Sequence, residues 1–146
     1  MLLKILAGAA LLVSGLAGCA LGIDAGKSPQ GHYKVDVGYQ AAYAIAMQQA
    51  RQCLTGKDAY TVRGQIDDIG RKATVRVTAP FTTNDIARVE IAGTDPSRSD
   101  LHIAMWGRGI WNGDAVIAMR DAIRFGVPSC VSYMPSDRND PVRAPK

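Results

Sequence analysis

The chain has 146 residues, of which 47% are hydrophobic and 21% charged, and its formal net charge is +4. A chain of this length supports one domain with a single core. The basic side chains are spread along the sequence without a dense run, so composition gives no support to nucleic-acid binding. No apolar run reaches the roughly 20 residues that a membrane-spanning helix needs, so we do not expect such a helix.

The first residues have the order of an export signal. Lys4 is followed by an apolar run, residues 5–16, which only Ser14 and two glycines interrupt, and then by Leu16-Ala17-Gly18-Cys19. An ordinary secretory signal is cut between small residues and has no use for a cysteine at the junction. An ordinary signal in which Cys19 stands there by chance is therefore the less favoured alternative.

The segment Leu16-Ala17-Gly18-Cys19 resembles the lipobox of bacterial lipoproteins, in which an apolar residue and two small residues precede an obligatory cysteine. The resemblance implies that residues 1–18 are a signal peptide and that the Cys19 thiol carries lipid. Acyl chains contribute about 0.8 kcal/mol per buried methylene, so two or three of them would anchor the protein to a membrane. Ala20, where retained lipoproteins have Asp, implies an outer-membrane location, and we expect the domain to face the periplasm.

Two cysteines, Cys53 and Cys130, remain besides Cys19. An even pair in an exported protein predicts one disulfide, because the periplasm is oxidising. Two buried thiols, or a reactive cysteine, are the alternatives that the sequence leaves open.

In chain order, residues 19–30 are small, polar and glycine-rich, and we expect them to form a flexible tether. A helix is predicted over Val37 to Leu54, with Asp36 as its N-cap and Gly56 ending it. Its apolar side chains recur at spacings of three and four residues. They are Tyr39, Tyr43, Ala46, Met47, Ala50 and Leu54.

The period of the pattern then changes to two, which is typical of strands with one wet face. A hairpin is predicted over residues 60–79 with its turn at Asp68 to Arg71, and strands are predicted at Ala87 to Ile91 and Leu101 to Trp106. A second helix follows over Asp114 to Phe125. Its cap is Asn112, its end is Gly126, and its inward side chains are Val116, Met119 and Ile123.

A last strand is predicted at Val131 to Met134, after Pro128. The order is therefore α-β-β-β-β-α-β, in an α+β fold. An antiparallel sheet of four to five strands with both helices on one face lets every element bury its apolar side. We expect a single domain over residues 31–134 and a disordered tail over residues 135–146, which are rich in proline and charge.

The most distinctive segment runs from Gly107 to Asp114, where a strand is followed by a helix. As one hypothesis, Trp106, Arg108 and Trp111 form a binding patch for a small molecule or a glycan, since backbone N–H groups gather around anions at such positions. The favoured interpretation is a glycine-containing tight turn whose tryptophans close the edge of the core.

We find no pattern that predicts catalysis, a cofactor or a metal. The two histidines, His32 and His102, have no other ligands at metal-binding spacing. No nucleophile motif is present. The adjacent carboxylates Asp67 and Asp68 fall at a turn and favour turn chemistry over hydrolysis. Ser129 beside Cys130 is interpreted as structural.

The layout resembles small lipoproteins of Gram-negative bacteria in which a lipobox precedes a helix, four strands and a Gly-Asp turn that opens a second helix. The matching residues are Cys19, the helix around Tyr43 to Cys53, and Gly113-Asp114. That resemblance implies no activity. We therefore expect a non-catalytic envelope lipoprotein that acts through an envelope protein or glycan partner. The alternatives are the ligand-binding patch described above and an enzyme that uses His102.

Overall fold

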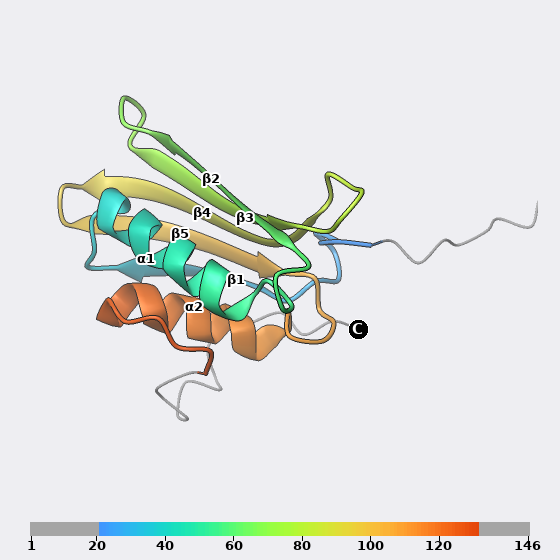
Figure 1. Cartoon of the computed structure of the whole chain (residues 1–146). Coiled ribbons are helices and arrows are strands. Elements are labelled where there is room, and N and C mark those ends of the chain that lie inside the picture. The colour runs from blue at the N-terminus through green and yellow to red at the C-terminus, as the bar shows by residue number, and fades with distance from the viewer. Residues whose placement is uncertain (1–20, 132–146) are drawn as a thin grey trace, which may run out of the picture.

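The computed structural model describes residues 21–131, which form a five-stranded antiparallel sheet with two helices packed on one face (Figure 1). The strand order across the sheet is β1-β5-β4-β3-β2. The elements are β1 (Gln30–Val35), α1 (Tyr39–Cys53), β2 (Thr61–Asp67), β3 (Lys72–Thr78), β4 (Asp85–Asp95), β5 (Arg98–Met105) and α2 (Gly113–Phe125). The predicted α+β class, the antiparallel sheet and the series helix, four strands, helix are confirmed.

The core lies between the sheet and the helices. Val75 of β3 faces Val89 of β4, which in turn faces Ile103 of β5, and all three side chains are buried. Residues on either side of them in each strand point to the opposite face, which carries polar and charged side chains, because strand side chains alternate. The period-two pattern of the sequence therefore separates the helix-covered face from the open face.

Helix α1 begins later than predicted. Its N-cap is Gly38, whose carbonyl accepts a hydrogen bond from the Ala42 N–H at 2.9 Å. Asp36 lies outside the helix, with its carboxylate 3.4 Å from Arg98 Nε, so its prediction as the cap was wrong. At the other end Leu54 caps the helix, and Gly56 follows in the left-handed region at φ 52°. The predicted apolar stripe packs on the core.

The segment before α1 differs most from expectation. We predicted a flexible tether over residues 19–30, yet Ser28 is buried, Gln30 opens β1, and the Ile23 N–H donates to the Asp85 carbonyl at 2.8 Å. Strand β1 pairs with β5 along its whole length and forms one edge of the sheet. It escaped prediction because Gln30, His32 and Lys34 alternate with only one strongly apolar residue, Val35.

Helix α2 agrees with the sequence. The Asn112 side chain accepts a hydrogen bond from the Ala115 N–H at 3.0 Å, and Gly126 ends the helix at φ 70°. The three side chains predicted to face inward are fully buried.

An unpredicted buried ion pair joins Arg120 to Asp121 at 2.7 Å, with the Arg120 guanidinium 5.2 Å from the centre of the Tyr33 ring. Burial raises the pKa of Tyr33, and the nearby Arg120 opposes that rise.

Several predictions fall outside the described residues: the signal peptide, Cys19 and its lipid, most of the last strand, and the tail over 135–146. Of the predicted last strand only Val131 is described, and it is not part of a strand. Within residues 21–131, neither helix is long and apolar enough to cross a membrane.

Candidate functional site

The glycine-rich turn between β5 and α2 is closed by its own backbone. The Gly107 N–H donates to the Trp111 carbonyl at 2.7 Å, and the Trp111 N–H donates to the Arg108 carbonyl at 3.1 Å. Gly107 and Gly109 have positive φ angles of 100° and 57°, which residues with a Cβ atom rarely adopt. The glycines of this segment thus serve a tight turn.

The two tryptophans of the turn have different environments. Trp111 is only 7% exposed, its indole N–H donates to the Leu54 carbonyl at 2.9 Å, and its ring meets Tyr60 edge to face with centroids 4.5 Å apart. Trp106 is partly buried, and the Arg108 guanidinium lies 5.4 Å from its ring centre. Trp111 therefore links the end of α1 to the turn before α2 as a core residue.

Of the three residues of the hypothetical binding patch, two are thus available. Trp106 and Arg108 come together at the surface, but the indole of Trp111 is occupied inside the protein and cannot stack on a ligand without unfolding its surroundings. The arrangement favours the interpretation of the segment as a structural turn.

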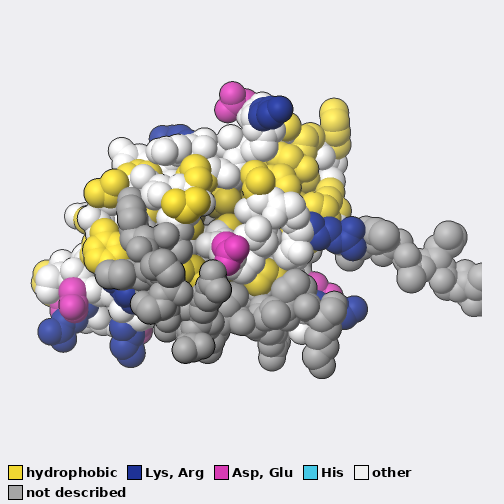
Figure 2. Space-filling model, turned by 90° about the horizontal axis from the view of Figure 1, so that it is seen from below, with side chains coloured by type: hydrophobic (Ala, Val, Ile, Leu, Met, Phe, Trp, Pro, Cys, Tyr) yellow, Lys and Arg dark blue, Asp and Glu magenta, His cyan; other side chains and the backbone are white. Residues whose placement is uncertain are grey.

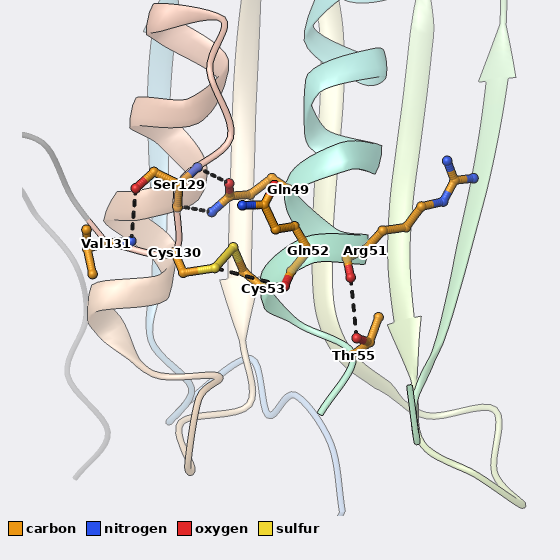
Figure 3. Close-up of a disulfide and its surroundings, with 8 residues drawn as sticks. All are labelled: Gln49, Arg51, Gln52, Cys53, Thr55, Ser129, Cys130 and Val131. Atoms are coloured by element: carbon orange, nitrogen blue, oxygen red, sulfur yellow. Dashed lines mark hydrogen bonds between the residues drawn. A yellow bond between two sulfur atoms is a disulfide. The ribbon is translucent and has the colours of Figure 1, made fainter. Parts of the chain in front are cut away.

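The predicted disulfide is present. Cys53, the last residue of α1, is bonded to Cys130, five residues after the end of α2, with their Cα atoms 5.2 Å apart (Figure 3). This cross-link ties the C-terminal ends of the two helices together, and it uses two of the three cysteines of the chain.

A polar contact that the sequence did not predict lies beside the disulfide (Figure 3). The Gln49 amide, which is buried one turn before Cys53, donates from Nε2 to the Ser129 carbonyl at 2.6 Å and accepts from the Ser129 N–H at 2.8 Å. Ser129 is therefore held through its backbone, in agreement with its predicted structural role. Gln49 lies outside the predicted apolar stripe, and its only sequence signal is its position one turn before a cysteine.

His102 lies on the open face of the sheet, opposite Glu90 of β4. Its Nδ1 is 2.9 Å from Glu90 Oε2, its Nε2 is 2.9 Å from Gln30 Oε1, and its ring stacks on His32 with centroids 4.1 Å apart. Seen from below, Figure 2 shows hydrophobic side chains gathered in several places between polar ones, with no histidine among the side chains that the grey atoms leave visible. Both ring nitrogens of His102 have partners within the protein, which weakens the hypothesis that it acts on a substrate.

The paired aspartates lie at the β2–β3 turn. Asp67 Oδ1 accepts hydrogen bonds from the N–H groups of Ile69 at 3.1 Å and Gly70 at 3.0 Å. Asp68 accepts instead from the Tyr39 hydroxyl at 2.8 Å. Asp67 therefore serves the turn, as predicted, whereas Asp68 joins the turn to the start of α1.

One feature of the open face escaped the sequence analysis. Arg63 of β2 faces Arg76 of β3, which faces Arg88 of β4, so three arginines stand opposite one another across three strands. Like charges in this arrangement repel. Among the described residues, Asp85 pairs with two of the three, at 2.6 Å from Arg76 Nε and 3.3 Å from Arg88 Nη1. The sequence places each arginine on the polar face, but only the strand register aligns them.

A shallow groove of about 360 Å³ adjoins this row. It is lined by Leu21, Gly22, Ile23, Arg76, Thr83, Asn84, Asp85 and Arg88.

Within the described part of the chain, no three His, Cys, Asp or Glu side chains are grouped so that they could hold a metal ion. Comparison of the chain with protein-family models and with curated proteins finds no match.

Proposed function

We propose that the protein is an envelope lipoprotein, cleaved before Cys19 and anchored by lipid on that residue to the outer membrane, with its domain facing the periplasm. The observation that carries the proposal is the use of the cysteines. The bond between Cys53 and Cys130 needs an oxidising compartment such as the periplasm to persist. It also leaves Cys19, of the three cysteines in the chain, as the one available for lipid.

Within the envelope, we propose a non-catalytic role through contacts with other envelope components. The supporting observations are that both ring nitrogens of His102 are engaged by neighbouring side chains and that the two aspartates at the β2–β3 turn accept hydrogen bonds within the fold. The open face of the sheet carries polar or charged side chains on all five strands, such as His32, Arg63, Arg76, Arg88 and His102. Such an open face suits a protein or glycan partner more than it suits a reaction on a buried small molecule. We infer no nucleic-acid partner from the spread of the basic residues.

The alternative, a ligand-binding module at Trp106, Arg108 and Trp111, has less support. Trp111 donates its indole N–H to the Leu54 carbonyl and is nearly buried, so only Trp106 and Arg108 remain for a ligand. A glycan would have to stack on Trp106 alone.

Membrane fractionation of the full chain tests the proposal. We expect the wild-type protein in the outer-membrane fraction, resistant to extraction with salt and alkali, because acyl chains hold it there. Cys19→Ala should lose this location, appearing either in solution or in the inner membrane with its signal uncleaved. The double variant Cys53→Ala with Cys130→Ala is the matched control and should stay anchored if it folds. Wild-type protein in the inner membrane would contradict the placement, and an unchanged location of Cys19→Ala would contradict the anchor.

A further inference from the structure

The chain enters the domain at one defined place. The Leu21 carbonyl accepts a hydrogen bond from Asn84 Nδ2 at 2.9 Å, and the Ile23 N–H donates to the Asp85 carbonyl at 2.8 Å. Between them Gly22 is buried at φ 119°, and a Cβ there would lie 3.0 Å from the Asp85 carbonyl oxygen. The entry point is therefore fixed beside the loop that joins β3 to β4 (Figure 1).

This entry point limits where the lipid is attached. Cys19 precedes Leu21 by two residues, and a chain spans at most about 3.6 Å per residue, so their Cα atoms lie within about 7 Å in any conformation. If Cys19 carries lipid, as the proposed function requires, this end of the domain is held at the membrane surface. The inference below rests on that proposal.

The β3–β4 loop carries an aromatic side chain that the domain does not use. Phe81 is fully exposed, at 107% of its reference area, and has a φ of 61°, which is rare for a bulky residue. Backbone outliers of this kind persist where surroundings or function require them. Phenylalanine is among the residues that bury in the interfacial layer of membranes. Because Phe81 lies beside the lipid attachment point, its ring is close enough to the membrane to insert into the interfacial layer.

The same end carries two arginines that pair with one aspartate. Arg76 and Arg88 share the single carboxylate of Asp85, and Arg76 Nη2 also donates to the Thr83 carbonyl of the loop at 3.3 Å. Arg88 Nε is buried without a hydrogen-bond partner among the described residues. Guanidinium groups suit phosphate oxygens because they offer planar, paired donors. The Arg76 and Arg88 side chains are 43% and 34% exposed, so lipid phosphates at the membrane surface can reach the exposed part of each guanidinium group.

We propose that this end of the domain is a membrane-contact surface, with the Phe81 ring in the headgroup layer of the bilayer that holds the Cys19 lipid, and with Arg76 and Arg88 on lipid phosphates. The anchor then does more than retain the protein. It fixes the orientation of the domain, so that the β2–β3 and β4–β5 turns point away from the membrane toward partners.

A spin label tests this directly. With Cys19 lipidated and Cys53 bonded to Cys130, a cysteine introduced at residue 81 is the only free thiol. The labelled Phe81→Cys protein is purified from membranes, reconstituted in vesicles of phosphatidylethanolamine and phosphatidylglycerol, and measured for accessibility to a water-soluble nickel relaxing agent. Ile69→Cys is the matched control, since Ile69 is 98% exposed on the β2–β3 turn at the far end of the sheet. We expect nickel accessibility several-fold lower at residue 81 than at residue 69.

The contribution of the Arg76 and Arg88 charges is tested in the same labelled protein. Arg76→Gln with Arg88→Gln should raise nickel accessibility at residue 81, while Lys34→Gln with Arg98→Gln, which removes equal charge near the far end, should leave it unchanged. Inorganic phosphate added to the buffer should not reproduce the lipid effect. Equal accessibility at residues 81 and 69 in a lipidated protein would overturn the inference and leave the proposed function standing. If mass analysis shows that Cys19 carries no lipid, both fail.

Discussion

At the scale of single residues, Trp111 decides between the two interpretations of the glycine-rich turn. The sequence shows two tryptophans, an arginine and glycines close together, and this pattern fits a binding patch as well as a core edge. What separates them is the hydrogen bond from the Trp111 indole to the Leu54 carbonyl, a residue 57 positions earlier in the chain. A contact of that separation depends on how α1 and the turn pack, which no local pattern contains.

Trp111→Phe is therefore expected to destabilise the protein by about 2 kcal/mol, because it leaves the buried Leu54 carbonyl without its donor. Urea unfolding followed by circular dichroism measures the change in the free energy of unfolding. Trp106→Phe is the matched control and should cost less than about 1 kcal/mol, since surface-side substitutions away from such bonds have small effects. Equal losses in the two variants would contradict the assignment of Trp111 to the core.

Asp68 gives a residue-scale prediction about pH. Hydrogen bonds from Gln40 and from the Tyr39 hydroxyl lower the pKa of Asp68 below its ordinary 3.8, and the bond to Asp68 raises the pKa of Tyr39 above its ordinary 10.0. The Asp68 contribution to stability is therefore present above pH 3.8 and is lost as the pH falls through the lower folded value. The Tyr39 contribution is present below pH 10.0 and is lost as the pH rises through the higher folded value.

Titration of the Asp68 carboxyl carbon by NMR tests this. In Gln40→Ala, and to a smaller extent in Tyr39→Phe, the pKa of Asp68 should move back up toward 3.8. A pKa that does not respond to either substitution would show that these hydrogen bonds are absent in solution.

At the scale of elements, local signals were sufficient for α2 but not for the start of α1, where the predicted cap Asp36 lies outside the helix. Asn112 caps α2 and Gly126 ends it because capping needs only residues a few positions apart. Strand β1 was missed because an edge strand with polar outward residues lacks the apolar run that marks a central strand. The alignment of Arg63 with Arg76 and Arg88 could not be predicted, because register depends on turn geometry as well as on pattern.

The disulfide between the ends of the two helices leads to a prediction about stability. Cys53 and Cys130 are separated by 77 positions, and a cross-link over such a loop stabilises the folded state by roughly 4 kcal/mol on the chain-entropy model. Cys53→Ala with Cys130→Ala should therefore lower the free energy of unfolding by about that amount. Gln49→Leu, with the disulfide intact, should cost less, because the cross-link still holds Ser129 near α1. A double variant as stable as the wild type would show that the Gln49–Ser129 contact is sufficient to hold the two helix ends.

At the scale of the whole molecule, the fold places different properties at its two ends. The chain entry at Leu21 to Ile23, the exposed Phe81 and two of the arginines lie at one end, and the exposed β2–β3 turn lies at the other. An anchor at the first end would hold the sheet end-on to the membrane. The open face of the sheet, with His102 and its neighbours, would then remain accessible from the side. In this arrangement partners approach the open face or the far turns.

Lipid anchoring through Cys19 is tested by the intact mass of protein purified from membranes, with and without reduction, beside Cys19→Ala. We expect a chain that lacks residues 1–18, carries acyl groups and gains two hydrogens on reduction, while Cys19→Ala carries no acyl group. A product without lipid would contradict the anchoring that the rest depends on, and free thiols at Cys53 and Cys130 would contradict the disulfide.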